Sequence, residues 1–204
     1  MASMSESRLV LDWDGTVTEM DSLHMVLLRF GDAGVYERAE ESLGRGLTLH
    51  EVNGMEFETV RAPLEEVVAW CGENVRVRPG LAPLVEQFRP LVVSSGFHEL
   101  IEPILAREGV EVELLANRLD PRPDGWLVRW RDETACPVCG EPCKRSTLPE
   151  GPFVYAGDGY SDRCVALAAD RVFAREGLAE YLDEQGVPYE PFETLDEITV
   201  ALQR

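Results

Sequence analysis

Short apolar runs alternate with helical patterns over most of this chain. The first run, residues 8–12, ends in acidic residues and a glycine, which is typical of a buried strand that leads into a loop. Further apolar runs that predict strands lie at residues 91–94, 111–116, 153–158 and 171–173. Amphipathic segments that predict helices separate them. Strands that alternate with helices predict an α/β fold with a mostly parallel sheet.

A helical block interrupts this alternation directly after the first predicted strand. Asp21 is placed to cap a helix that Gly31 ends, and Thr48 with Glu51 has the spacing of a capping box. No strong strand pattern occurs between residues 17 and 75. We therefore expect a small helical cap, inserted into an α/β core, with the cap formed by residues 17–78 and the core by residues 1–16 and 79–204.

Composition and charge narrow the class of protein. The chain has 204 residues, of which 45% are hydrophobic, so it can bury a core and is not a disordered chain. Its formal net charge is −19, which would repel phosphate backbones and anionic membrane surfaces. Its longest apolar runs are far too short to cross a bilayer. We therefore expect neither a nucleic-acid partner nor a membrane partner.

The cysteines and the first residues bear on the compartment. Five cysteines, an odd number spread unevenly, argue against a secreted disulfide scaffold. The first eight residues, MASMSESR, lack the apolar segment of a signal peptide. We therefore expect a cytoplasmic protein. We also expect it to be a monomer or a homodimer.

Two carboxylates follow the first predicted strand in the sequence Asp12-Trp-Asp14-Gly-Thr. At positions i and i+2 they can face the same side, and Gly15 lets the backbone turn sharply over them. Adjacent carboxylates repel, so a divalent cation or a proton must hold them together. In phosphoryl chemistry one carboxylate can attack phosphorus while the other protonates the leaving group. The alternative is a solvated Asp-Gly turn.

Two later segments carry groups that could bind an anion. The hydroxyls of Ser94 and Ser95 precede a glycine and a helix start, where free N–H groups point at the same spot. Of the 19 basic residues, Lys144 is the one Lys, and the other 18 are Arg. An ammonium beside phosphate oxygens would neutralise charge during transfer. Taken alone, the serines are better explained as a helix cap, and Lys144 is better explained as an exposed surface residue.

A third strand end carries acids in the sequence Gly157-Asp158-Gly159-Tyr-Ser-Asp162. Glycines on both sides of Asp158 permit close backbone approach, and its carboxylate is a hard oxygen ligand suited to Mg²⁺. Asp162 would lie in the first helical turn that follows, where it could orient a ligand or accept from Lys144. The alternative is an Asp-Gly turn with an acid at a helix start.

Together these motifs carry a resemblance that none carries singly. The order DxDGT, apolar-apolar-Ser, Lys and GDGxSD resembles the haloacid dehalogenase superfamily of phosphatases. The helical insertion after the first motif is similar to the cap of the subclass that contains phosphoserine phosphatase. The resemblance implies an α/β core with a helical cap, in which Asp12 is the nucleophile and forms an aspartyl-phosphate. It also implies that Asp14 is the general acid and then the base that activates water.

The same resemblance implies a phosphate site and a magnesium site. Ser94, with Ser95 and Lys144, would bind the transferring phosphate of a small phosphorylated metabolite. Mg²⁺ would be held by Asp12, the backbone carbonyl of Asp14 and Asp158. Asp162 would contact these metal-binding groups without binding the metal itself.

Two groups within this subclass are similar to the chain in different ways. The sequence Cys139-Gly-Glu-Pro-Cys143-Lys144 resembles a bacterial group that includes the methionine-salvage phosphatase acting on a hydroxy-keto-methylthiopentenyl phosphate. Phosphoserine phosphatases carry a Glu nine residues after the nucleophile and a cap Arg, which hold the amino acid. Here Asp21 takes the place of that Glu, and Arg61 is a candidate for the Arg. His98 is a further candidate to face the site.

A cysteine cluster, Cys136-x-x-Cys139-x-x-x-Cys143, precedes Lys144. Three thiolates need a fourth ligand for a closed zinc site, and a structural Zn²⁺ would fix the loop that carries the lysine. His98, Cys71 or Cys164 could supply that ligand if the fold brings one near. The alternatives are reduced thiols or one local disulfide.

Three hypotheses about function stay open on the sequence alone. The first is a Mg²⁺-dependent phosphomonoesterase. The second is a catalytically idle relative that binds a metal or a phospholigand. The third is a phosphotransferase that passes phosphate to an acceptor other than water.

Overall fold

A computed structural model describes residues 7–148 and 150–204. Within these ranges seven strands form one sheet in the order β4-β3-β2-β1-β5-β6-β7. All neighbouring pairs are parallel except the β3–β4 hairpin, which is antiparallel. The strands are β1 (Arg8–Leu11), β2 (Leu91–Phe97), β3 (Glu113–Asp120), β4 (Leu127–Arg129), β5 (Phe153–Gly157), β6 (Arg171–Ala174) and β7 (Glu190–Pro191). The α/β class and the mostly parallel sheet are confirmed.

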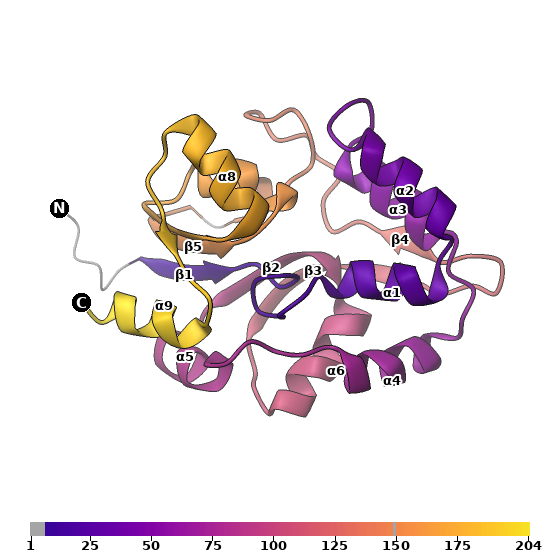
Figure 1. The fold of residues 1–204 in the computed structure, drawn as a ribbon, viewed down its shortest axis with the longest axis horizontal. Coiled ribbons are helices and arrows are strands. Elements are labelled where there is room, and N and C mark those ends of the chain that lie inside the picture. The colour runs from indigo at the N-terminus through magenta and orange to yellow at the C-terminus, as the bar shows by residue number, and fades with distance from the viewer. Residues whose placement is uncertain (1–6, 149) are drawn as a thin grey trace.

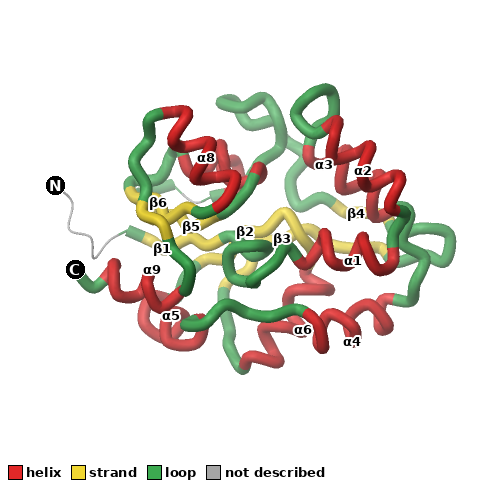
Figure 2. Tube along the Cα trace, viewed as in Figure 1, coloured by secondary structure: helices red, strands yellow, loops and turns green. Residues whose placement is uncertain are grey.

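Helices cover both faces of the sheet (Figures 1 and 2). Alternate residues of β1 enter different cores: Leu9 and Leu11 face one apolar cluster, and Val10 faces the other. This period of two is what a strand buried on both sides requires. The first face carries α5 (Leu81–Phe88), α6 (His98–Glu108) and α9 (Leu195–Leu202), and the second carries α7 (Arg163–Ala166) and α8 (Glu176–Gln185).

The helical block after β1 contains α1 (Ser22–Phe30), α2 (Ala33–Ser42), α3 (Leu49–Phe57) and α4 (Leu64–Asn74). Asp21 accepts from the His24 N–H, and Thr48 and Glu51 form both bonds of the capping box, so the two expected helix starts are confirmed. Helices α2 and α3 pack on each other, α3 contacts β4, and α4 packs against α6. The boundaries of a separate cap at residues 17–78 stay a prediction.

Three elements differ from the expectation. The helix expected to follow Asp158 is a 3₁₀ turn, Tyr160–Asp162, followed by the single turn of α7. Helix α2 lies within the expected helical block but was not singled out as a separate helix, because its sequence is rich in charge and it buries one side chain, Ala39. Strand β7 was not expected either, because it has two residues and no apolar run. Across residues 7–148 and 150–204, no helix is both long and apolar enough to cross a bilayer.

Candidate active site

The candidate residues from distant parts of the chain meet at the carboxyl edge of the sheet. Strand β1 lies between β2 and β5 in the sheet, and all three run parallel. Asp12 follows β1, Ser94 lies in β2 and Asp158 follows β5. The Asp12 N–H donates to the Ala156 carbonyl at 2.9 Å, which extends the β1–β5 ladder to this residue. The edge is where ligands bind in open α/β sheets.

Lys144 enters this edge from a 3₁₀ turn, Lys144–Thr147, and contacts two of the acids. Its Nζ lies 2.5 Å from Asp12 Oδ1 and 2.6 Å from Asp162 Oδ1. The Lys144 side chain is 2% exposed. Burial alone would lower the pKa of Lys144, but the carboxylates of Asp12 and Asp162 raise it above its ordinary value. The ammonium is therefore charged at neutral pH.

Asp162 holds this ammonium and the start of the next turn together. Its Oδ1 also accepts from the Tyr155 hydroxyl at 2.5 Å, and its Oδ2 accepts from the N–H groups of Asp158 and Gly159, each at 2.9 Å. Burial would raise the pKa of Asp162, but Lys144 and these donors lower it. Both carboxylate oxygens of Asp162 are therefore already bonded within the protein.

The acids at this edge have donors that fit a magnesium ion. Asp12, Asp158 and Asp162 each offer a carboxylate oxygen, and these oxygens lie within 4.8 Å of one another. Burial, and then the charge of Asp162, raises the pKa of Asp158 to about 7. Hard oxygen donors are the ligands that Mg²⁺ takes, and a divalent cation offsets the repulsion between them. The residues present therefore fit Mg²⁺.

Asp14 lies in a different environment from Asp12. The Ser22 N–H donates to Asp14 Oδ1 at 3.1 Å, the Ser22 hydroxyl donates to the same oxygen, and Ser94 Oγ lies 3.5 Å from Oδ2. Burial, and then the charge of Asp21, raises the pKa of Asp14 to about 7, against the opposing effect of Ser22. Asp14 can therefore hold a proton near neutral pH.

Two glycines let the loops approach each other closely. A Cβ on Gly15, whose φ is +73°, would lie 2.2 Å from Asp158 Oδ2. The Thr16 hydroxyl then donates to Asp158 Oδ1 at 2.8 Å. The Gly96 N–H donates to Ser94 Oγ at 2.8 Å, which fixes that hydroxyl beside Asp14.

Arg78 fixes the loop that follows β1, and sequence reasoning missed it. Its guanidinium, buried in the fold, donates to the carbonyls of Thr16, Gly15 and Glu193 at 3.0, 3.1 and 2.8 Å. No local pattern indicates such a role, because Gly15, Thr16 and Glu193 all lie far from Arg78 in the sequence. Ser22 was missed as well, although its place at the first turn of a helix after the acidic motif is a signal.

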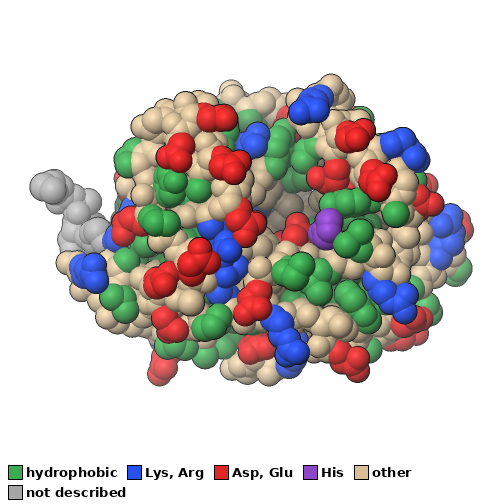
Figure 3. Space-filling model, viewed as in Figure 1, with side chains coloured by type: hydrophobic (Ala, Val, Ile, Leu, Met, Phe, Trp, Pro, Cys, Tyr) green, Lys and Arg blue, Asp and Glu red, His purple; other side chains and the backbone are tan. Residues whose placement is uncertain are grey.

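An acidic cavity lies between the acids Asp12, Asp14 and Asp158 and the helices α1 to α3. In the part of the chain that the structure describes, no Lys or Arg lines it. Figure 3 shows acidic side chains around a hollow near the centre of the face in view. Its lining beyond the motif acids includes Asp21, His24, Tyr36, Glu40, Asn53 and Glu56.

Glu56 is the most unusual residue of this cavity. Its side chain is buried, and within the described chain its Oε1 has no hydrogen-bond partner. Burial, followed by the charges of Glu40 and Asp21, raises its pKa to about 8. A buried polar atom without a partner costs free energy, so it marks a place where a ligand group can bond.

The other candidates fall inside and outside this cavity. Asp21 and Ser95 line it. Arg61 is exposed, donates to the Thr59 carbonyl at 3.1 Å, and does not line it. His98 is also absent from the lining, and its Nδ1 lies 2.7 Å from Glu102 Oε1.

The chain is similar to known proteins both in sequence and in fold. Residues 9–167 match the family model of the haloacid dehalogenase-like hydrolases. The chain is 31% identical to a 2-hydroxy-3-keto-5-methylthiopentenyl-1-phosphate phosphatase of Geobacillus kaustophilus, over 96% of this chain and 95% of that protein. Its fold is similar to a phosphoserine phosphatase from T. onnurineus, with a TM-score of 0.67, 20% identity, and coverage of 100% and 98% of the two chains.

Proposed function

This chain belongs to the haloacid dehalogenase-like hydrolase family and is a phosphatase, and we propose that it hydrolyses a small phosphate monoester through a covalent phosphate on Asp12. The observation that carries this proposal is the meeting of Asp12, Asp14, Lys144 and Asp158 at one sheet edge. Each side chain there is of the chemical type that the proposed reaction needs.

The nucleophile is one oxygen of Asp12. Within the described chain its Oδ1 accepts from the Trp13 N–H at 2.6 Å and faces Lys144 Nζ, which leaves Oδ2 to attack phosphorus. The attack forms the bond from Oδ2 to phosphorus and breaks the bond from phosphorus to the ester oxygen. Lys144 and the Ser94 hydroxyl, with Ser95 beside them, hold the phosphoryl oxygens during transfer.

Asp14 moves the protons. Its pKa of about 7 allows it to give a proton to the departing alkoxide at neutral pH. The resulting carboxylate then takes a proton from water, whose oxygen attacks the same phosphorus and releases inorganic phosphate. Asp12 is restored as a carboxylate at the end of the cycle.

Mg²⁺ is the metal that this donor set favours. Asp12, Asp158 and the Asp14 backbone carbonyl would hold it, and when bound it supplies positive charge against the phosphate oxygens. Asp162 is left to position Lys144, because its oxygens already accept hydrogen bonds from Lys144, Tyr155, Asp158 and Gly159.

The acidic cavity supports a choice of substrate class. Asp21 and Glu40 would repel a carboxylate on the alcohol part of the ester, and Arg61 is not there to bind one. The alcohol is therefore uncharged or carries an amino group. The substrate in the printed name of the Geobacillus relative, a methylthiopentenyl phosphate, is of the uncharged kind. Phosphoserine is disfavoured for its carboxylate.

A panel of phosphate esters tests the proposal. Phosphate release is measured with Mg²⁺ for 2-hydroxy-3-keto-5-methylthiopentenyl-1-phosphate, a methylthio-sugar phosphate, phosphoethanolamine and phosphoserine. We expect kcat/KM for at least one of the first three to exceed that for phosphoserine by about tenfold or more, since a misplaced charge costs over 1.4 kcal/mol. A preference for phosphoserine contradicts the substrate class. Tight binding without any hydrolysis supports the idle relative, and diversion of phosphate to added alcohols supports a phosphotransferase.

A further inference from the structure

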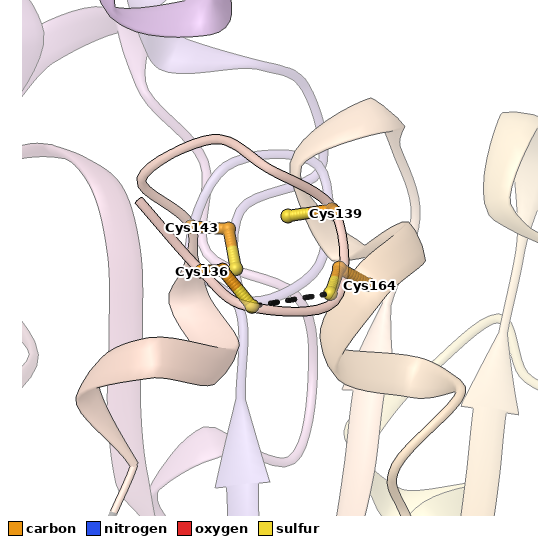
Figure 4. Close-up of side chains that lie close together, drawn as sticks. All are labelled: Cys136, Cys139, Cys143 and Cys164. Atoms are coloured by element: carbon orange, nitrogen blue, oxygen red, sulfur yellow. Dashed lines mark hydrogen bonds between the residues drawn. The ribbon is translucent and has the colours of Figure 1, made fainter. Parts of the chain in front are cut away.

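Four cysteines form a cluster beside the loop that carries Lys144 (Figure 4). Cys136, Cys139 and Cys143 precede the lysine, and Cys164 comes from α7. Their four sulfur atoms lie within 4.8 Å of one another, and the sulfurs of Cys136 and Cys164 are 4.0 Å apart. The fifth cysteine, Cys71 of α4, is buried in the core of the other face.

The spacing of these sulfurs suits a tetrahedral ion. A Zn²⁺ ion with four thiolates at about 2.3 Å sets the sulfurs about 3.8 Å apart. The observed sulfurs reach this arrangement with shifts below about 1 Å each. In the described chain all five cysteines are free, so the cluster is not a pair of disulfides.

The local backbone is shaped around two of the sulfurs. The Gly140 N–H donates to the Cys136 carbonyl at 2.8 Å, and Gly140 has a φ of +82°, so the chain turns tightly between Cys136 and Cys139. The N–H groups of Val138 and Cys139 face the Cys136 sulfur. N–H donors aimed at sulfur are the outer contacts that orient thiolates toward a metal.

A second pair of N–H groups serves the other end of the loop. Those of Arg145 and Ser146 face the Cys143 sulfur, just as the 3₁₀ turn of Lys144 begins. Cys136 is buried, Cys143 and Cys164 are half-buried, and Cys139 is exposed. The cluster is therefore enclosed by protein on most sides and open to solvent at Cys139, which provides an entry path for an ion.

We propose that Cys136, Cys139, Cys143 and Cys164 bind one structural Zn²⁺ ion. Four protein ligands fill the coordination sphere, so the site has no open position for catalysis. A closed zinc site needs a fourth ligand besides the three cysteines that precede Lys144, and the fold supplies Cys164. His98 faces Glu102 instead, and Cys71 lies elsewhere.

The site joins the two backbone segments that carry the buried ion pair of Lys144 and Asp162. Cys143 directly precedes Lys144, and Cys164 follows Asp162 by two residues. An ion that holds both cysteines fixes the loop and α7 relative to each other, and with them the distance from Lys144 to Asp162. The existence of the site is independent of the proposed function, and its effect on turnover rests on that function.

Metal content tests the proposal first. The chain is purified without an affinity tag or added metal, and its zinc content is measured by elemental mass spectrometry. We expect one zinc per chain. Replacement by Co²⁺ should give the intense thiolate charge-transfer absorption and the visible bands of a tetrahedral tetrathiolate site. Mg²⁺ bound to carboxylates gives neither signal.

Two matched variants locate the site. Cys139→Ser removes the exposed ligand, and Cys71→Ser removes a thiol outside the cluster. We expect zinc content to fall at least about tenfold in the first, with a lower Tm, and to stay at one per chain in the second. If Cys139→Ser fails to fold, removal of zinc from the wild-type chain by a chelator gives the same comparison by its Tm.

Several results would overturn the proposal. They are metal-free protein with no Co²⁺ spectrum, two disulfides among the four cysteines in non-reduced protein, and stoichiometric iron in place of zinc. A chain that holds zinc but hydrolyses no phosphate ester contradicts the proposed function and leaves the zinc site supported. A purified chain that hydrolyses phosphate esters but contains no zinc supports the proposed function and contradicts the zinc site.

Discussion

The ammonium of Lys144 lies 2.6 Å from the carboxylate of Asp162, and both side chains are almost fully buried. A Lys in such a place is stable only because acids surround it, and the acids are stable only because of the Lys. An Arg is larger, and its planar fork does not replace a compact ammonium between Asp12 and Asp162. The single Lys of this chain therefore occupies a position where the otherwise abundant Arg does not fit.

Replacement of Lys144 by Met should destabilise the protein. The change leaves Asp12 and Asp162 buried without their cation, which costs about 3–5 kcal/mol in the free energy of unfolding at neutral pH. Urea denaturation of Lys144→Met measures this loss, with Arg145→Met as the neighbouring control. Equal losses in the two variants contradict the role of Lys144.

Replacement of Asp14 by Asn should slow catalysis and spare binding. Asn keeps the size of the side chain and removes its proton, so kcat for an alkyl phosphate should fall about 10²–10⁴-fold. Inhibition by inorganic phosphate should be unchanged. The loss should be smaller for p-nitrophenyl phosphate, whose leaving group needs no proton. Equal losses for both esters argue against Asp14 as the acid.

Activity on alkyl phosphates should decline as pH rises above neutrality. The pKa of Asp14 is about 7, so the group loses its proton as pH rises through that value. With Mg²⁺ saturating, kcat should then fall by up to about tenfold per pH unit. Asp14→Asn should lack this limb of the profile. A wild-type profile that is flat from pH 6 to pH 9 contradicts the assignment.

Glu56 should make stability depend on pH. Folding raises its pKa from 4.5 to about 8, so between these values the folded state binds more protons than the unfolded state. Unfolding free energy therefore falls as pH rises through this window. Tm should drop less between pH 5 and pH 8 in Glu56→Gln than in the wild type. The control Glu58→Gln, at an exposed position of the same segment, should follow the wild type.

Much of the fold and the motif acids could be predicted from local pattern. Strand ends placed Asp12 and Asp158, and capping residues placed the starts of α1 and α3. Parallel strands then bring such ends together. The expected roles of these residues, and the cap boundaries, stay predictions.

The rest depends on contacts between distant segments. Arg78 bonds carbonyls of three separate residues, and Glu56 is buried in a helix that packs against α2 and β4, so neither role has a local signature. Cys164 lies 21 residues after Cys143, and only the packing of α7 beside the loop makes it the fourth member of the cluster. Arg61 shows the converse, since the resemblance to phosphoserine phosphatases suggested a role and the fold leaves it exposed.

The nucleophile is the central claim, and Asp12→Asn tests it most directly. Phosphate release from p-nitrophenyl phosphate with Mg²⁺ is measured for the wild type, for Asp12→Asn and for the exposed-site control Asp124→Asn. If Asp12 is the nucleophile, the rate falls at least about 10³-fold in Asp12→Asn alone, with folding shown intact by circular dichroism. Equal rates in the wild type and Asp12→Asn would contradict it.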